Sequence, residues 1–335
     1  MDGVAFHVKR AGLTERAAVC QLESMARKSF PLIIAHRGAS GYLPEHTLEA
    51  KAMAHAQGAH YIEQDLVLTK DDVPVVLHDI HVDSVTDVAE KFPQRKRRDG
   101  RYYALDFTLA ELKTLRVMER FDPATGKQIF PKRFQKGLGS FQIATLEEEL
   151  QLIQGLNRST GRIAGIYPEI KDPAWHRAQK HDITRIVLTI LRRYGYRNKE
   201  DPCFIQCFEL DELKRLRGPL RWRGNLVMLL DTVPSGPGNT DFNHLRTPKG
   251  LADLAKIADG IGPDIESVIG PDRKPTALVK NAHACDLKVH PYTFRVDELP
   301  KFAKSPEDLL KLLFKKAGID GLFSDFPDVA IKWGK

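Results

Sequence analysis

Short apolar runs recur along this chain, and several of them end abruptly in charged or titratable residues. The first run covers residues 32–35 (LIIA) and leads directly into His36, Arg37 and Gly38. A run this short, apolar at every position, is typical of a strand in a parallel sheet, because both faces of such a sheet are covered. The same criterion predicts strands over residues 61–68, 73–77, 165–170, 203–208, 226–230, 259–263, 288–294 and 318–323.

Helical patterns lie between most of these strands. Apolar positions recur at helical spacing over residues 183–194 and 251–258, and a further helix is predicted to open near Asp211. The alternation of strands and helices predicts an α/β fold, specifically a (β/α)8 TIM barrel.

Nine strand candidates are one too many for that barrel. The second and third candidates are separated only by residues 69–72. Because this connection is too short for a parallel crossover, residues 73–77 are predicted to pair with the preceding strand as an antiparallel hairpin. A turn between Lys70 and Asp71 would set His78 roughly opposite Glu63.

The domain organisation follows from where the alternation is interrupted. Residues from about 80 to 142 are long, basic and rich in Pro, Gly and aromatics, so they are predicted to form an inserted small subdomain near the barrel mouth. Residues 31–335 otherwise form one barrel domain, and residues 1–30 form an N-terminal extension.

The polar residues at the strand ends carry the candidate chemistry. Glu63 and Asp65 are two apart on a predicted strand and therefore share a face. Two such carboxylates repel and raise each other's pKa unless a cation lies between them, which a hard divalent ion would provide. His78 follows the next apolar run, and Glu169 and Lys171 again share a face. Separate salt bridges would explain each pair, but not their recurrence at one mouth of a barrel.

The residues after the first strand suit a reactive site as well. His36 can exchange a proton near neutral pH, and Arg37 offers a fork of donors for a phosphate or carboxylate. Gly38 and Gly41 allow a sharp turn or a close approach to a ligand. The alternative is a core histidine and a surface arginine beside an ordinary turn.

These segments together resemble the glycerophosphodiester phosphodiesterase family. The motifs stand in the family's order: HRG at 36–38, PEHT at 44–47, EQD at 63–65, HD at 78–79 and EIK at 169–171. The His in PEHT replaces the commoner Asn, as in the branch that resembles the bacterial periplasmic enzyme of glycerol 3-phosphate salvage. That branch, which also has an inserted subdomain, is further resembled by residues 99–103, 289–293 and 321–327.

The resemblance implies a metal-dependent hydrolysis of glycerophosphodiesters to sn-glycerol 3-phosphate and a free alcohol such as choline or ethanolamine. The candidate ligands of one Ca²⁺ or Mg²⁺ are Glu63, Asp65 and Glu169, whose oxygens suit a hard cation. His36 and His78 are the candidate general acid and base, in either order. The candidate substrate-binding residues are Arg37, Lys171, Glu45 and Gln206.

Weaker expectations concern residues near this set. Glu45 could instead orient its turn, and Gln206 could make a structural hydrogen bond. His46 is expected to be a surface or structural residue, whereas Asp325 resembles a family position that could support a neighbouring base. Nothing in the sequence marks a dedicated pocket for the departing alcohol, so tolerance of different head groups is expected.

Composition sets the remaining bounds. The formal charge of +7 and the pI near 9.1 suit an anionic substrate. A basic run at 91–101 is predicted to be a solvated loop face, and no nucleic-acid-binding motif accompanies it, so nucleic acid is not an expected partner. No apolar run approaches 18 residues, which predicts no stable membrane insertion. The oligomeric state is left open.

Residues 1–30 carry charges throughout and lack the apolar stretch of a signal peptide. As numbered, the chain is therefore predicted to be cytoplasmic, whereas the resemblance implies the periplasm. Two other functions stay open: a phospholipase of the same barrel type, which needs an exposed apolar rim, and a noncatalytic binding protein, which predicts a missing histidine or carboxylate.

Overall fold

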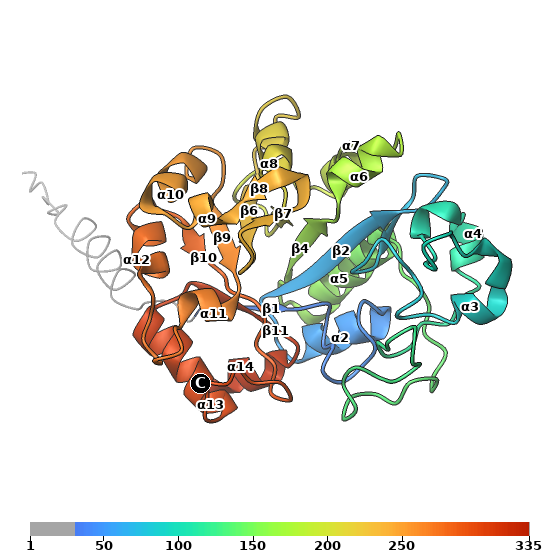
Figure 1. Ribbon diagram of the computed structural model, residues 1–335, viewed down its shortest axis with the longest axis horizontal. Coiled ribbons are helices and arrows are strands. Elements are labelled where there is room, and N and C mark those ends of the chain that lie inside the picture. Colours follow the sequence, from blue (N-terminus) through green and yellow to red (C-terminus); the bar gives the residue numbers. More distant parts are fainter. Residues whose placement is uncertain (1–30, 335) are drawn as a thin grey trace, which may run out of the picture. The chain divides into compact units, whose positions relative to one another are not determined.

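The computed structural model describes residues 31–334, and their core is a parallel β-barrel (Figure 1). The order of strands in the sheet is β10-β9-β6-β5-β4-β2-β1-β11. The eight strands are β1 (Leu32–Ala35), β2 (Tyr61–Leu68), β4 (Gly165–Ile170), β5 (Phe204–Cys207), β6 (Asn225–Leu230), β9 (Gly260–Pro263), β10 (Lys288–Val289) and β11 (Gly321–Ser324). The predicted (β/α)8 barrel is confirmed.

Backbone hydrogen bonds outside the regular ladder close the barrel between β11 and the segment that follows β10. The N–H of Phe323 donates to the carbonyl of Pro291 at 3.0 Å, and the N–H of Phe294 donates to the carbonyl of Phe323 at 2.8 Å. The strand predicted over 288–294 is regular only at Lys288–Val289. Its irregular remainder contains Pro291, which has no N–H to donate to a ladder.

Helices surround the strands, with α2 and α5 beside β1, β2 and β4 in Figure 1. Their bounds are α2 (Leu48–Ala56), α5 (Leu146–Thr160), α6 (Pro173–Ala178), α7 (Ile183–Arg193), α8 (Leu210–Arg217), α9 (Phe242–Leu245), α10 (Pro248–Leu254), α11 (Ile265–Val268), α12 (Ala277–His283), α13 (Pro306–Leu310) and α14 (Pro327–Trp333). None of the described helices has both the length and the apolar character needed to cross a membrane.

The helix ends follow from local chemistry. Helix α5 begins with a capping box, in which Thr145 and Glu148 each bond the other's backbone N–H, and ends at Gly161 in the left-handed conformation with φ 71°. The helix predicted over 251–258 begins earlier, at Pro248, because the Thr247 side chain caps the N–H of Gly250.

The predicted hairpin is confirmed: β3 (Pro74–Val76) pairs antiparallel with β2. The register pairs Leu66 with Val76, which is one residue away from the expected alignment of Glu63 with His78. The regular ladder ends there, although the N–H of Leu77 still donates to the carbonyl of Asp65 at 2.9 Å. The chain after β3 is therefore held beside the carboxyl half of β2.

An aromatic layer fills the barrel interior. Tyr167 stacks on Phe204 with ring centroids 5.1 Å apart, and it also packs edge-on against Phe323. The Tyr167 hydroxyl lies 2.9 Å from Nδ1 of His290, which is fully buried. Because inward-facing positions recur every two residues, the next such positions on β4 and β5 are Glu169 and Gln206. The aromatic layer is thus the floor beneath the polar groups.

Residues 80–142 connect β3 to α5 with little regular structure, including α3 (Val88–Lys91) and α4 (Leu109–Leu112). They bury a cluster of their own that includes Val82, Phe107 and Phe141 and that extends onto Val67 and Val75 of the β2–β3 hairpin. The stretch is therefore anchored to the hairpin. Its status as a separate subdomain stays a prediction, and the N-terminal extension at residues 1–30 lies outside the described residues.

Candidate active site

The carboxyl ends of the first strands surround an inner cavity of about 140 Å³. From the sequence-predicted set, the residues that line it are His36, Arg37, Glu63, Asp65, His78, Glu169 and Gln206. The predicted convergence of strand-end chemistry at one mouth is thus seen in the structure. Lys171 and Glu45 do not line this cavity: Lys171 pairs with Glu169 at 2.7 Å, and Glu45 lies behind Arg37.

Three carboxylates form the centre of the inner cavity. Glu63, Asp65 and Glu169 are buried, and each offers an oxygen within 4.8 Å of the others. Asp65 and Glu169 are neighbours because the parallel register pairs β2 with β4 at these two residues. Burial and the nearby carboxylates raise the pKa of Glu63 well above its usual range, and burial raises the pKa of Glu169 to about 8.

This cluster fits a hard divalent cation. Burial would raise the pKa of Asp65, but Lys171 and His46 outweigh that effect and hold it well below its usual range. Its Oδ1 is nevertheless buried and receives no hydrogen bond from residues 31–334, and the same is true of Oε1 of Gln206. Such orphaned acceptor oxygens are costly unless a donor or a cation satisfies them. Together, the three carboxylates and these orphaned oxygens match the ligand preferences of Ca²⁺ and Mg²⁺.

A buried chain of polar groups orients Asp65 from behind. His46 Nε2 lies 2.8 Å from Asp65 Oδ2, and its Nδ1 lies 3.2 Å from Nζ of Lys51. Burial and Lys51 lower the pKa of His46 to about 3, so the ring is neutral, donates to Asp65 and accepts from Lys51. Lys51 in turn pairs with Glu149 at 3.3 Å. The sequence predicts only a surface or structural role for His46, whereas the structure shows that it hydrogen-bonds Asp65, a candidate metal ligand.

Arg37 is held through both its backbone and its side chain. Its backbone has a left-handed φ of 58°, which turns its N–H toward Glu63 Oε2 at 2.9 Å. Its Nη1 donates to Glu45 at 2.9 Å, and Arg120 binds both oxygens of the same carboxylate at 2.7 and 3.0 Å. Although burial opposes ionisation, Arg120 and Arg37 hold the pKa of Glu45 well below its usual range. Glu45 therefore positions Arg37.

Each candidate acid–base histidine is oriented by an aspartate. His36 Nδ1 lies 2.6 Å from Asp325 Oδ1, and His78 Nδ1 lies 2.7 Å from Asp79 Oδ1. Burial lowers the pKa of His36, although Asp325 opposes the shift. Burial, Arg37 and Lys171 lower the pKa of His78 to about 4. Both rings therefore direct Nδ1–H at a carboxylate and leave Nε2 available for substrate.

Comparison with known proteins shows the family of this chain. The family model described as the glycerophosphoryl diester phosphodiesterase family matches residues 36–329. This chain belongs to that family. A glycerophosphodiester phosphodiesterase from Haemophilus influenzae is 43% identical over 330 residues, which cover 92% of this chain and 91% of the relative. One from Treponema pallidum is 36% identical and covers 90% and 91%. The resemblance seen in the motifs is confirmed.

Solved structures agree on the fold. A protein of Silicibacter pomeroyi superposes with a TM-score of 0.69 at 24% identity and covers 94% of this chain and 96% of its own. A phosphodiesterase of Oleispira antarctica, solved with its product sn-glycerol-3-phosphate, gives a TM-score of 0.60 at 21% identity, with coverages of 91% and 96%.

Sequence reasoning missed Arg120 and Arg295. Arg120 joins Glu45 to Asp79, which it binds at 2.8 Å, and it comes from the irregular stretch after β3. Tyr292 and Arg295 line the inner cavity from the segment after β10. The motifs contain no signal for Arg120 or Arg295, whereas the sequence places Tyr292, in the segment VHPYT at 289–293, near the predicted barrel mouth and slightly favours a packing role for it.

Proposed function

We propose that this chain hydrolyses glycerophosphodiesters to sn-glycerol 3-phosphate and an alcohol, using one divalent cation and two histidines. The observation that carries the proposal is the triad of Glu63, Asp65 and Glu169 beside two aspartate-held histidines in one cavity. The names of the relatives support the reaction class. The product bound to the Oleispira antarctica phosphodiesterase supports the glycerol 3-phosphate half of the substrate.

The cation would be held by Glu63, Asp65 and Glu169. When bound, it supplies positive charge for a phosphate oxygen and for a glycerol hydroxyl. Arg37 adds a cation beside the same carboxylates: its Nε lies 3.7 Å from Asp65 and has no hydrogen-bond partner in the part of the chain that the structure describes. Such fixed charges act most strongly where negative charge accumulates in the transition state. Arg37 is therefore assigned to the phosphate.

His36 is assigned as the general base. Its Nε2 lies 3.8 Å from Glu63 Oε2, so the free nitrogen faces the carboxylate cluster, where the attacking hydroxyl would lie. Because Asp325 accepts the hydrogen bond from Nδ1–H, Nε2 is the atom that can take the proton. Removing this proton lets the oxygen form its bond to phosphorus.

His78 is assigned as the general acid. It lines the inner cavity and also a neighbouring cavity of about 240 Å³, so it lies where the alcohol would depart. A protonated His78 gives its Nε2 proton to the leaving oxygen as the phosphorus–oxygen bond breaks. Its low pKa makes the imidazolium a strong acid, and the negative phosphate of a bound substrate would favour protonation beforehand. One water is consumed for each diester cleaved.

A choline-release assay on glycerophosphocholine, with and without a chelator, tests this function. We expect release that falls below detection on exhaustive chelation and returns when Ca²⁺ or Mg²⁺ is added back, because the triad cannot hold three charges together without a cation. Undiminished activity after chelation would remove the metal from the proposal. Phosphatidylcholine is the comparison substrate, and faster cleavage of the intact lipid would favour the phospholipase alternative.

A further inference from the structure

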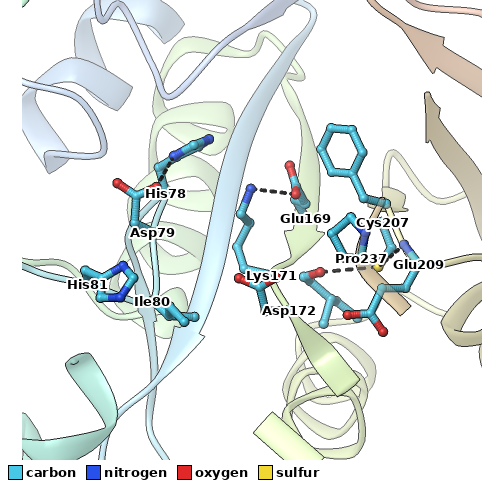
Figure 2. A pocket seen from close by; sticks show the side chains of 12 residues that line it. His78, Asp79, Ile80, His81, Glu169, Lys171, Asp172, Cys207, Glu209 and Pro237 are labelled. Atoms are coloured by element: carbon cyan, nitrogen blue, oxygen red, sulfur yellow. Dashed lines mark hydrogen bonds and ion pairs between the residues drawn. The ribbon is translucent and has the colours of Figure 1, made fainter. Parts of the chain in front are cut away.

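A second cavity, here called the outer cavity, adjoins the inner one. Its volume is about 240 Å³, and it shares His78, Glu169 and Phe208 with the inner cavity. In Figure 2, His78 to His81 lie on one side of it, Cys207, Glu209 and Pro237 on the other, and Lys171 and Asp172 between them. Any group that leaves the phosphate past His78 enters this space.

The charged groups of the outer cavity differ in whether they form ion pairs within the described residues. Asp79 is paired with His78 and Arg120, and Lys171 is paired with Glu169. By contrast, Asp172 and Glu209 form no ion pair with any group in residues 31–334. Asp172 is half-buried, and its side chain accepts no hydrogen bond there. The cavity thus presents two carboxylates that form no direct ion pair within the described residues, although Arg177 acts on Glu209 from farther away.

Glu209 is the more buried of the two carboxylates. It is 3% exposed, and both of its oxygens lie 3.2 Å from the N–H of Ala174 in the first turn of α6. Burial raises its pKa to about 7, and Asp172 adds to the shift. A single backbone N–H does not compensate a buried negative charge, so a cation in the cavity would stabilise the ionised form.

We propose that the outer cavity binds the cationic head group of the substrate, an ammonium-bearing alcohol of the choline or ethanolamine type, through Asp172, Glu209 and Phe208. This inference rests on the proposed function and adds a preference among its substrates. Carboxylates attract both kinds of ammonium ion, and the face of an aromatic ring attracts a quaternary one. Phe208 lines both cavities and therefore lies at their junction, and its ring already faces one cation, Nζ of Lys171, 5.8 Å from the ring centroid.

Asp172, Glu209 and Phe208 would affect which head group is preferred without taking part in the reaction at phosphorus. None of the three carries a proton or charge used at phosphorus in the proposed mechanism. A diester with a neutral head group, such as glycerophosphoglycerol, therefore needs the inner cavity alone. Selectivity is then the ratio of kcat/KM for glycerophosphocholine to kcat/KM for glycerophosphoglycerol, and this ratio isolates the outer cavity from the catalytic residues.

Two conservative variants test the proposal: Asp172→Asn and Glu209→Gln, of which the second keeps an acceptor oxygen for Ala174. We expect each to lower the selectivity ratio about fivefold to tenfold, the usual loss for one charge that faces a ligand charge. Asp211→Asn is the matched control, because Asp211 is an exposed carboxylate on α8 that pairs with Lys214. The control should leave the ratio unchanged.

Free choline provides a second measurement that does not depend on turnover of its own diester. It should inhibit hydrolysis of glycerophosphoglycerol by the unmodified chain, and about fivefold to tenfold more choline should be needed in either variant. If both variants keep the selectivity ratio and the choline inhibition of the unmodified chain, the proposed head-group site is wrong. An equal loss on both diesters would also overturn it, since that result indicates a structural role. If the unmodified chain hydrolyses neither diester, the proposed function itself fails.

Discussion

The inner and outer cavities adjoin each other, yet they are built differently. The inner cavity is formed by residues at the ends of paired strands, and most of its charged groups have an ionic partner in the protein: His36 has Asp325, Arg37 has Glu45, and Glu169 has Lys171. The outer cavity is lined largely by residues that follow strands, and Asp172 and Glu209 form no ion pair with any group of residues 31–334. Groups that act at phosphorus must be held in place whatever the head group is. Residues that choose among head groups can instead lie on loops.

The connection between the two cavities is a chain of ionic hydrogen bonds. Arg37 binds Glu45, Glu45 binds Arg120, and Arg120 binds Asp79, which orients His78 at the boundary. Arg37, which we propose binds the phosphate, and the candidate acid His78 are therefore oriented by the same chain of residues. This chain depends on Arg120, which belongs to the irregular stretch after β3. That stretch thus contributes to the site although it supplies no strand to the barrel.

The largest expected effect separates the two histidines. Replacing His36 or His78 by Ala should lower kcat on glycerophosphocholine by roughly two to four orders of magnitude, the usual contribution of a positioned acid or base. With a nitrophenyl ester of glycerol 3-phosphate, whose leaving group needs no proton, His78→Ala should lose much less, while His36→Ala should lose as much as before. Steady-state kinetics on both substrates measure this difference.

Equal losses on the two substrates for both variants would contradict the assignment of His78 as acid. A reversal, with His36→Ala rescued by the nitrophenyl ester, would exchange the two roles. Circular dichroism and melting temperature serve as the folding control. Asp79→Asn provides a further check, because it should reproduce a weaker form of the His78 defect if the aspartate orients that ring.

The sequence was sufficient to predict the carboxylates and histidines of the inner cavity because these residues lie in short linear motifs. Strands β1, β2 and β4 occupy the predicted residues, since each is an apolar run bounded by polar residues. The period of two then placed Glu63 and Asp65 together, and the barrel topology brought Glu169 beside them. Each step needed only local pattern and one rule of topology.

The outer cavity could not be predicted in this way. Its distinctive residues, Asp172, Glu209 and Pro237, follow three different strands, and no period or motif relates them. Arg120 was missed for a similar reason: it is separated by 75 residues from Glu45 and lies outside regular structure. The one-residue shift of the hairpin register has the same origin, because the exact turn over residues 69–73 depends on local hydrogen bonds that alternation does not specify.

The second expected effect concerns the inner cavity alone. Without a cation, Glu63 and Glu169 have raised pKa values in the folded state, so their contribution to stability is full below about pH 4.5 and is lost as pH rises toward about 8 for Glu169. Bound Ca²⁺ or Mg²⁺ displaces those protons and removes the repulsion. The increase in melting temperature caused by the cation should therefore grow from pH 5 to pH 8 and reach about 5 °C at saturating cation.

Thermal denaturation with and without cation at several pH values measures this linkage. Glu169→Gln removes one charge of the triad and should abolish most of the pH dependence, whereas Asp172→Asn, in the outer cavity, should leave it intact. An increase that is the same at pH 5 and pH 8 would contradict cation binding by these carboxylates.

The smallest expected effect is the salt dependence of head-group preference. Asp172 is half-buried and open to solvent at the outer cavity, so its attraction for an ammonium ion is partly screened, whereas the contacts around the triad are buried. Raising the ionic strength from about 0.01 M to about 0.15 M shortens the screening length from about 30 Å to about 8 Å. The ratio of kcat/KM for glycerophosphocholine to that for glycerophosphoglycerol should then fall about twofold to threefold. Asp172→Asn should lose most of this dependence, because it removes the more exposed of the two charges. A ratio that stays constant over this range in the unmodified chain would mean that the outer cavity distinguishes head groups by shape rather than by charge.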